Sequence, residues 1–520
     1  MVTWMWLLVW LQQPLTLGVG GAEGFAYENF QKAHAVWQRA VSAHGLATLA
    51  SGSQTWISSK QELTLSLEGH YREPWMRREI TATLQRQLRL DGQGFVLVTE
   101  QERGGEVLRE DVVFSQSQVS VREFGSTNFQ KIGAEDERFE DWHREARWRD
   151  PLVILTRIAT RLPSLQFLGE TENSTDPGGK PMTVVSYVED QGTACKVYFD
   201  RETYLVQRLE VAYHHEGFGD QIELFCFLDY RQIHQLWMPF EVQERRYEGT
   251  SGLLTSTKVQ HVEVHHRTPK ELLQVQDEQL DSKPTAFVWL DLGEGVASVT
   301  FEGEEGRSYV VAFADFSLVI TATQSSTASE RLLQMIQERL PEQPVKYAAL
   351  SHFHPHYSWG LRPFIARGIS ILTTPHTQVY LERLANNAHL FKADALQLQP
   401  KGPVLEKVID KKSLRDQTQH LEIFDIGEAS NHTPEYLIFY LPKLKLVIQG
   451  DLLWVRRDGT TYRGGPRAKG LWEFIQTQRL EVETIATTGD YKDYISWIPM
   501  GLFSDLAKGE NSLLKRISQH

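Results

Sequence analysis

The chain has 520 residues, of which 41% are hydrophobic and 23% are charged, and this length predicts two or more domains. Its formal net charge of −13 argues against nucleic acid as a partner, because such binding depends on basic side chains that neutralise phosphates. Two cysteines are too few for a disulfide scaffold or a thiolate zinc site, which directs attention to the 18 histidines.

The amino terminus carries features of an export signal. A nearly apolar run, Trp4–Leu11, is followed by a polar break and by the small residues Gly20-Gly21-Ala22. The run is too short to span a bilayer as a helix, but it suits the apolar region of a signal peptide. No Lys or Arg precedes it, and a buried N-terminal helix is the alternative. We expect residues 1–22 to be a signal peptide and the mature protein to be periplasmic or extracellular.

Residues 23–266 are predicted to form a β-rich domain. Apolar residues at helical spacing predict a helix from Tyr27 to Leu46, and a short helix is expected from Pro151 to Leu162. Alternation of apolar and polar residues predicts strands at 62–68, 79–84, 94–99, 112–121, 182–188, 196–199, 205–213, 222–230, 240–247 and 255–265. Many antiparallel strands with two short helices favour a strongly curved sheet or half-barrel.

This β-rich half resembles the periplasmic lipoprotein carriers in its pattern of strands and helices. The resemblance implies an unclosed barrel that shelters a lipid or another apolar ligand, whereas the alternative is an accessory domain with an ordinary core. Cys195 and Cys226 fall on two predicted strands that flank a third strand. Such strands lie about 9.6 Å apart, which favours two buried free thiols over a disulfide.

A polar segment, residues 267–285, is predicted to link this domain to a second one at 286–520. In the second domain, predicted strands alternate with predicted helices at 328–340 and 377–386; the strands are 298–301, 308–313, 317–321, 345–350, 370–373, 421–426, 436–441 and 444–449. This alternation predicts a layered arrangement of strands and helices, so that the whole chain is expected to be an α+β protein.

Three histidines, His352, His354 and His356, occupy alternate positions directly after the predicted strand 345–350. Composition alone would produce such a triplet about 0.02 times in a chain like this one. Pro355 favours an extended conformation at His354, and residues two apart in extended chain share one face, so His352 and His354 can bind one ion. Neutral imidazoles are good zinc ligands. Three exposed loop histidines are the alternative.

The segment Ser351–Tyr357, Ser-His-Phe-His-Pro-His-Tyr, resembles the signature of the metallo-β-lactamase superfamily, Thr-His-x-His-x-Asp-His after a strand. Gly427–Thr433 is similar to the next ligand loop of that superfamily, and Gly450-Asp451 is similar to its bridging aspartate. The resemblance covers about residues 286–500. It implies an αββα sandwich and a metal site of His352, His354, His432 and Asp451 that holds about one Zn²⁺ per chain.

The sequence departs from the superfamily where a second metal would bind. His356 stands where the family has Asp, Tyr357 where it has His, and Thr488 where its final His is expected, with Asp490 nearby. We therefore expect a degenerate second site beside an intact three-His site. The resemblance leaves three candidate catalytic residues: Asp451 to hold a water, His356 to accept a proton and Tyr357 to stabilise an oxyanion. For His356 and Tyr357, the alternative is a polar side chain packed against the loop.

These observations predict a secreted zinc-dependent hydrolase that acts on a small-molecule substrate. Three neutral histidines leave one position of a zinc ion open, and the pKa of a water bound there falls to about 7. The alternative is a non-catalytic scaffold with the metallo-β-lactamase fold whose N-terminal domain binds a lipid or another apolar ligand. Loss of the family's Asp and His at His356 and Tyr357 motivates this second hypothesis.

Overall fold

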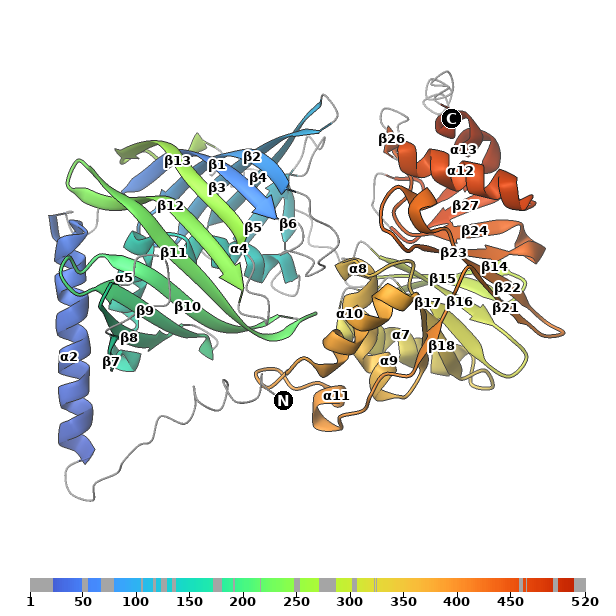
Figure 1. Ribbon diagram of the computed structural model, residues 1–520, viewed down its shortest axis with the longest axis horizontal. Helices are drawn as coiled ribbons and strands as arrows, with labels where there is room; N and C mark the ends of the chain where they lie inside the picture. The colour runs from blue at the N-terminus through green and yellow to red at the C-terminus, as the bar shows by residue number, and fades with distance from the viewer. Residues whose placement is uncertain are drawn as a thin grey trace. The chain divides into compact units, whose positions relative to one another are not determined.

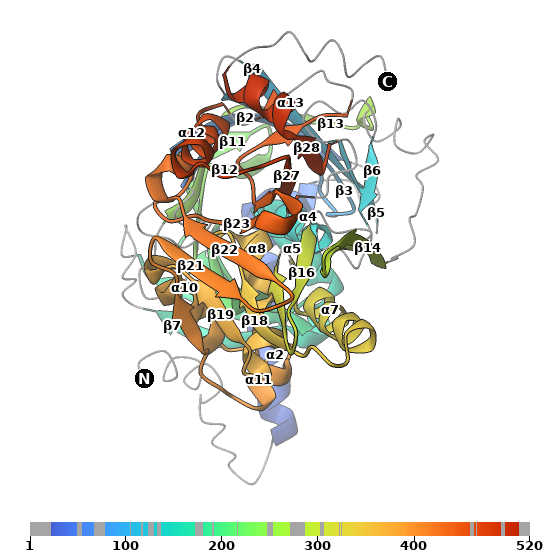
Figure 2. The same cartoon turned by 90° about the vertical axis from the view of Figure 1, so that its right-hand side faces the viewer.

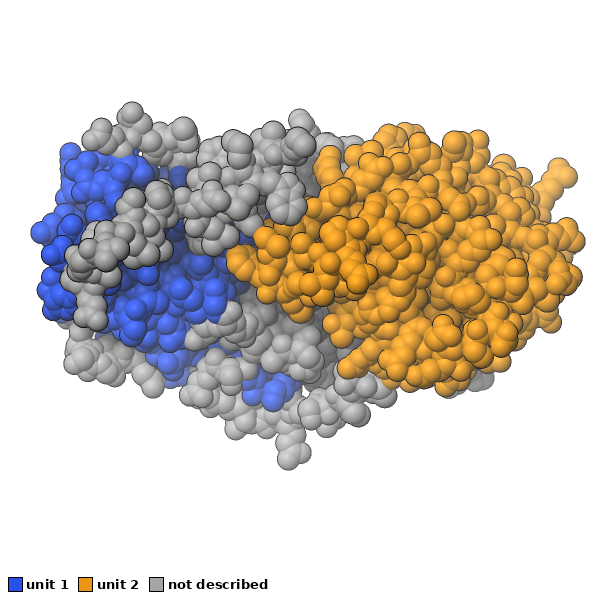
Figure 3. Space-filling model, turned by 90° about the horizontal axis from the view of Figure 1, so that it is seen from below, with its two compact units in different colours: residues 1–213, 221–282 blue, residues 214–220, 283–520 orange. Residues whose placement is uncertain are grey.

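The computed structural model describes residues 22–48, 55–66, 79–103, 106–115, 118–122, 129–132, 137–171, 180–189, 192–215, 217–246, 253–270, 287–301, 306–321, 323, 325–457, 462–463, 465–489 and 494–508. The chain divides into two compact units, one of residues 1–213 and 221–282 and the other of residues 214–220 and 283–520 (Figure 3). The apolar run at 4–11 and most of the predicted linker lie outside the described residues. Among the helices that are described, none has the length and apolar character needed to cross a membrane.

The first unit consists mainly of strands. Its described helices are α2 (Ala22–Ala43), α4 (Glu137–Trp148) and α5 (Pro151–Thr160), with short 3-10 turns η1 (Leu46–Thr48) and η2 (Leu162–Ser164). Its strands are β1 (Trp56–Ser66), β2 (Glu79–Arg89), β3 (Gly94–Arg103), β4 (Glu106–Ser115), β5 (Gln118–Arg122), β6 (Gln130–Ile132), β7 (Gln166–Thr171), β8 (Met182–Val188), β9 (Ala194–Asp200), β10 (Val206–His215), β11 (Gly219–Ile233), β12 (Leu236–Arg246) and β13 (Leu253–His265).

Within the described residues these strands form one 13-stranded sheet, in the order β6-β5-β4-β3-β2-β1-β13-β12-β11-β10-β9-β8-β7 (Figure 1). The sheet therefore contains two meanders, β1–β6 and β7–β13, which are joined by the pairing of β1 with β13. That pairing is antiparallel and runs from Trp56 opposite His265 to Leu65 opposite Thr255. The antiparallel pairing agrees with the alternation of side chains in the sequence.

Helix α5 lies against both meanders of this sheet. Val153 packs with strands β2–β5, whereas Ile154, Leu155 and Ile158 pack with α2 and strands β8–β12. A helix that is apolar on nearly all sides is stable only when it is surrounded, and the curved sheet surrounds α5 in this way (Figure 1). Asp150 begins the helix by accepting a hydrogen bond from the Leu152 N–H at 2.8 Å.

The first unit differs from the sequence-based expectation in several details, among them strands β6 and β7, which were not predicted. The predicted strand 112–121 is two strands, β4 and β5, because the chain reverses between Ser115 and Gln118, which pair with one another. Helix α4 was not predicted, because its core-facing side chains, such as Trp142, Ala146 and Trp148, are spread among many charged ones. Both cysteines are free thiols; Cys195 is buried and Cys226 is half-buried, and burial raises the pKa of Cys195.

The second unit contains two larger sheets and several helices. The first sheet contains β14 (Phe287–Gly293), β15 (Val296–Phe301), β16 (Arg307–Ala312), β17 (Ser317–Ile320), β18 (Val345–Ala349), β19 (Ser370–Thr373) and β20 (Leu405–Lys407), in that order. The second contains β21 (Lys411–Arg415), β22 (His420–Asp425), β23 (Leu437–Leu441), β24 (Leu446–Gln449), β27 (Thr484–Thr487) and β28 (Trp497–Pro499). Strands β25 (Trp454–Val455) and β26 (Tyr462–Arg463) form a small separate ladder.

The helical elements of this unit are α7 (Ser326–Arg339), α8 (Pro355–Ser358), η4 (Trp359–Leu361), α9 (Arg362–Ala366), α10 (Pro375–Asn386), α11 (Ala395–Leu398), η5 (Gly427–Ser430), η6 (Pro442–Leu444), α12 (Pro466–Gln478) and α13 (Met500–Ala507). With these helices the chain is a mixed protein of strands and helices in which strands predominate.

The two larger sheets pack face to face, with helices on their outer faces (Figure 1, Figure 2). Val311 and Ile320 of the first sheet share a buried core with Phe439 and Ile448 of the second. On the outer face of the second sheet, Ile438 and Val447 pack with α12 and α13, whereas α9 and α10 contact β19 and β20 of the first sheet. Each sheet is therefore buried on both faces: helices cover its outer face, and apolar side chains fill the space between the two sheets.

Candidate metal centre

The histidine-rich segment follows β18 and lies where the two sheets of the second unit meet. The backbone N–H of Leu437 on β23 donates to the carbonyl of Ser351 at 2.7 Å and ties the segment to the second sheet. Residues 351–354 form bends, and α8 begins at Pro355, so the segment is not the regular extended chain that its spacing predicts. The His354 carbonyl accepts the N–H of Tyr357 at 3.0 Å, which closes the first turn of α8.

His352 and His354 nevertheless lie side by side. Their ring centroids are 4.3 Å apart, and both side chains are buried. The His352 ring stacks on Tyr436, with centroids 4.8 Å apart and an interplanar angle of 23°, and its Nδ1 lies 3.0 Å from Ser351 Oγ. The bend, rather than strand alternation, brings the two imidazoles together.

His432 reaches the same point from the loop between β22 and β23. Asn431 before it adopts a left-handed conformation at φ 49°, which ends the turn η5. The Ser430 hydroxyl accepts the N–H of His432 at 3.2 Å and donates to the Thr433 carbonyl at 2.9 Å, so the loop is held from within. The His432 ring centroid lies 4.8 Å from that of His352 and 4.7 Å from that of His354.

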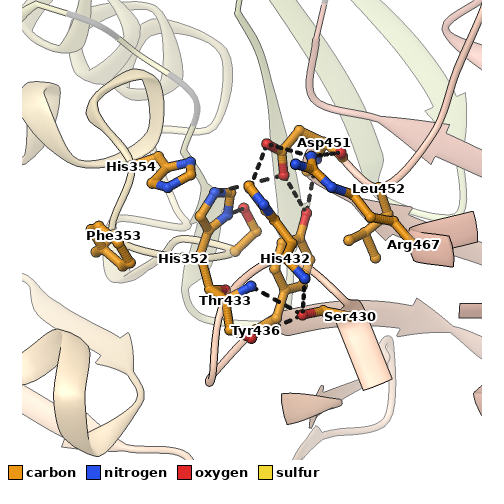
Figure 4. A network of polar contacts seen from close by, with 12 residues as sticks. His352, Phe353, His354, Ser430, His432, Thr433, Tyr436, Asp451, Leu452 and Arg467 are labelled. Atoms are coloured by element: carbon orange, nitrogen blue, oxygen red, sulfur yellow. Dashed lines mark hydrogen bonds and ion pairs between the residues drawn. The ribbon is translucent and has the colours of Figure 1, made fainter. Parts of the chain in front are cut away.

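Asp451 supplies the carboxylate of the cluster directly after β24. Its Oδ2 lies 2.8 Å from His432 Nε2, and its Oδ1 lies 3.6 Å from His352 Nε2. The Tyr436 hydroxyl donates to Asp451 Oδ1 at 3.1 Å and accepts the Asp451 backbone N–H at 2.8 Å. Figure 4 shows the three imidazoles and this carboxylate turned toward a common point.

The donor set fits a divalent transition metal. One ligand atom from each of His352, His354, His432 and Asp451 can be chosen so that all four lie within 4.8 Å of one another. Ligand atoms around a tetrahedral zinc ion stand about 3.3 Å apart, so small side-chain adjustments suffice to enclose an ion. The Nε2 atoms of the three histidines are shielded from solvent. Three imidazoles and one carboxylate are ligands that suit zinc and related ions.

Electrostatics favours an ionised Asp451. Burial alone would raise the pKa of this carboxyl group, but His432 and His352 beside it hold its pKa well below the usual value. The pKa of Tyr436 shifts in the opposite direction, because burial and the neighbouring Asp451 raise it well above 10. At neutral pH the pair is therefore a carboxylate that accepts a hydrogen bond from a neutral phenol.

The structure describes some of the other residues that the sequence singled out, but not all of them. Tyr357 is buried, and its ring centroid lies 4.7 Å from that of His352. Thr488, one residue beyond β27, is buried as well, and its backbone N–H donates to the Gln449 carbonyl at 3.0 Å. The backbone of His356 belongs to α8, whereas its side chain and all of Asp490 lie outside the described residues.

Two residues near the cluster were not predicted. Tyr436 contacts both His352 and Asp451, as described above. Arg467, at the start of α12, donates through Nη1 to the Asp451 carbonyl at 3.1 Å, and the same nitrogen lies 3.6 Å from Asp451 Oδ2 (Figure 4). Neither carries a sequence signal, because a tyrosine at the start of an apolar strand and an arginine in a basic loop are common.

Comparisons with known proteins gave no family model and no curated protein that matches this chain. Among solved structures, the chain is similar to a metallo-beta-lactamase from Pontibacter korlensis, with 17% identity and a TM-score of 0.32 over 44% of this chain and 99% of that one. It is also similar to the metallo-beta-lactamase FIM-1 from Pseudomonas aeruginosa in its mono-zinc form, with 17% identity and a TM-score of 0.32 over 46% of this chain and 98% of that one. A third similar structure is the DIM-1 metallo-beta-lactamase, at 15% identity and a TM-score of 0.31, over 44% of this chain and 97% of that one.

Proposed function

We propose that this protein is an exported, zinc-dependent hydrolase of the metallo-β-lactamase superfamily with one metal ion per chain. The observation that carries the proposal is the convergence of three buried imidazoles and one carboxylate, from three separate loops, within 4.8 Å. Buried histidines of a core rarely cluster around a shared carboxylate without a ligand to hold, because each desolvated polar group destabilises the fold.

The ion would be held by His352, His354 and His432, with Asp451 as a fourth ligand or as the acceptor for a water in the open position. A divalent ion in such a site supplies Lewis acidity and makes a bound water acidic enough to ionise near neutral pH. Asp451 is well suited to orient that water, because Tyr436 and Arg467 hold its carboxylate and its backbone.

His356 and Tyr357 belong to the proposal as groups that assist the reaction. The imidazole of His356 would accept a proton, since its unperturbed pKa of about 6.5 is suitable for a base. Tyr357 would donate a hydrogen bond to a developing oxyanion. The substrate is proposed to be a small molecule with a hydrolysable ester- or amide-type bond.

Metal content tests the proposal most directly. The full chain, expressed with export and purified without chelators, should contain about one zinc per molecule by elemental analysis. His432→Ala should lose it, because the variant removes one imidazole and leaves the loop bonds of Ser430 in place. His376→Ala is the matched control: this histidine belongs to the same unit, but its side chain is 65% exposed and pairs with Glu435.

Two other outcomes would contradict a single zinc ion per chain. Two ions per chain would mean that a second site exists beside the three-His site. A wild-type chain that takes up no metal even from supplied zinc would refute the hydrolase proposal. Co-purified lipid in such a chain would support the alternative, in which the second unit is a scaffold and the first unit binds an apolar ligand.

A further inference from the structure

The bend that carries His352 and His354 is held by a serine from the helix that follows it. Ser358 is the last residue of α8 and is fully buried. Its hydroxyl is shared between two carbonyls of the bend, at 2.8 Å from the Phe353 oxygen and 3.0 Å from the His354 oxygen. One carbonyl belongs to a proposed metal ligand and the other to the residue between the two ligands. Ser358 therefore acts on the backbone that carries both imidazoles.

The contact with Phe353 goes beyond the hydrogen bonding of a regular helix. In an α-helix the Tyr357 N–H would bond to Phe353, four residues earlier, but here it bonds to His354 at 3.0 Å. The Ser358 N–H bonds to His354 as well, at 3.2 Å. A helical serine commonly donates to the carbonyl four residues before it, which is again that of His354. Ser358 additionally supplies a donor to the Phe353 carbonyl, which the first turn of α8 does not use.

The side chain of Phe353 is fixed by α10. Phe353 is buried, and its ring centroid lies 5.8 Å from that of Tyr380. The Tyr380 hydroxyl oxygen lies 3.4 Å from Ser358 Oγ, so the two residues that hold Phe353 also contact each other. Figure 4 shows the Phe353 ring on the side of His352 that faces away from Asp451. The carbonyl and the ring of Phe353 are both held, so this residue cannot rotate without breaking a buried contact.

We propose that Ser358 is a positioning residue whose hydroxyl holds the bend in the shape that turns His352 and His354 toward one metal ion. The two ring centroids are 4.3 Å apart, and the backbone of Phe353 is what joins them. Ligands that are already held in their binding geometry lose less conformational freedom when the ion binds. Without the hydroxyl, the metal itself would have to order the bend. The inference rests on the proposed function for the bound ion, but the hydrogen bonds do not depend on it.

Zinc affinity of the full chain, measured by competition with a chromophoric chelator, is the first test. Ser358→Ala should bind zinc about 10-fold more weakly, at the lower end of the usual range for groups that support metal ligands, because Ser358 contacts the ligand backbone rather than the rings. Ser358→Thr keeps the hydroxyl and should keep most of the affinity, even if its added methyl group lowers the Tm. Affinities that follow the Tm rather than the hydroxyl would overturn the proposal, as would equal affinities for the wild type and Ser358→Ala.

Ser329→Ala is the matched control. Ser329 lies on α7 in the same unit, is fully buried, and has its hydroxyl oxygen 2.6 Å from that of Thr323. This variant loses a comparable buried hydroxyl contact that does not involve the bend, so it should bind zinc as the wild type does. Circular dichroism should show every variant folded. If Ser358→Ala does not fold, Ser358→Cys takes its place with the same expected direction, because a thiol fills the space but donates only weakly.

The second test needs no metal. Hydrogen–deuterium exchange of the metal-free chain, read by mass spectrometry on peptides that cover α8, reports the amides of Tyr357 and Ser358, which both bond to His354. Exchange should be faster in Ser358→Ala and unchanged in Ser329→Ala. Equal exchange in the wild type and Ser358→Ala would show that the hydroxyl does not hold the bend. A wild-type chain that binds no zinc would refute the proposed function, whereas the exchange rates would still decide whether Ser358 fixes the bend.

Discussion

The carboxylate of Asp451 lies 2.8 Å from Nε2 of His432, because the hairpin of β23 and β24 brings its own two ends together. His432 precedes β23 and Asp451 follows β24, and the antiparallel register places Phe439 opposite Ile448 between them. Both strands of the hairpin are buried along their whole length, so their core packing fixes the distance between the two polar residues. The geometry of the cluster is thus set by apolar side chains as much as by the ligands themselves.

Replacing the charge of Asp451 should weaken metal binding. Asp451→Asn preserves the shape of the side chain but removes the negative charge that faces His352 and His432, and we expect zinc affinity to fall by at least 10- to 100-fold. Isothermal titration with zinc checks this value. Asp291→Asn is the control, because Asp291 is an exposed residue of β14 whose carboxylate accepts the Gly293 N–H. Equal zinc affinities for the wild type and Asp451→Asn would show that Asp451 does not take part in zinc binding.

A methyl group at position 450 should destabilise the second unit. In Gly450→Ala the new Cβ would lie 2.5 Å from two buried oxygens, and overpacking of this kind lowers the free energy of unfolding by about 1–3 kcal/mol. Chemical denaturation followed by tryptophan fluorescence measures the change. Gly402→Ala provides the comparison, since no atom lies within 4 Å of its added Cβ, and its stability should stay within about 0.5 kcal/mol of the wild type.

The buried pair of Arg157 and Glu189 should be sensitive to the loss of one partner. Arg157 Nε donates to Glu189 Oε1 at 2.6 Å, and both residues are buried in the first unit. Glu189→Gln leaves the guanidinium without its counter-charge, which should lower the free energy of unfolding by about 3–5 kcal/mol. Thermal unfolding should detect this change as a marked fall in the Tm of the first unit.

The same substitution in an exposed pair provides the control. Glu170→Gln removes the partner of Arg201, at 2.7 Å, where both side chains are substantially exposed. Exposed pairs contribute about 0–1 kcal/mol, so this variant should unfold almost as the wild type does. The double variant Arg157→Met with Glu189→Leu should recover much of the loss, because apolar replacement of a buried pair is often neutral. Equal effects of Glu189→Gln and Glu170→Gln would contradict the prediction.

His44 should make the first unit less stable in acid. Its Nδ1 lies 2.9 Å from the Trp237 carbonyl and its Nε2 accepts the Val206 N–H at 3.1 Å, and burial lowers the pKa of His44 to about 4. In the unfolded chain His44 binds a proton at about pH 6.5, whereas in the folded chain it does so only near pH 4. The folded state is therefore penalised as pH falls through this window, by about 3 kcal/mol in total.

A variant separates His44 from other groups that titrate in the same range. His44→Gln should be less stable than the wild type at pH 7.5, because it loses hydrogen bonds that join α2 to β10 and β12. The stability difference between the two proteins should shrink from pH 6.5 to pH 4, as measured by urea unfolding of the first unit at several pH values. A constant difference would show that His44 does not cause the acid sensitivity.

Much of the fold follows from local patterns. The predicted strands 182–188 and 370–373 match β8 and β19 to the residue, because both are short runs rich in apolar and β-branched residues that become buried. The break between β4 and β5 and the charged helix α4 escaped prediction. In both, a contact in the folded protein rather than the local pattern decides: the pairing of Ser115 with Gln118 in one, and burial of Trp148 among α2 and β10 side chains in the other.

Part of the candidate site could also be predicted from the sequence. His352 and His354 stand out by spacing, and His432 and Asp451 by likeness to known ligand loops, and the structure brings all four together. Tyr436 could not be recognised as a neighbour of His352 and Asp451, because these residues meet only once the hairpin and the loop after β18 have packed. The sequence also does not predict the left-handed conformation of Asn431, which directs His432 toward the cluster.

The pairing of β1 with β13 has a consequence for how the first unit could be divided. Each meander is continuous in sequence, so a cut between β6 and β7 would separate the chain into two pieces whose strands are each already neighbours. The pieces would then meet along the ladder from Trp56 to Leu65, around α5, and where α2 of the first piece packs against strands of the second. Reassembly of the unit from two co-expressed fragments would depend on these contacts between the pieces.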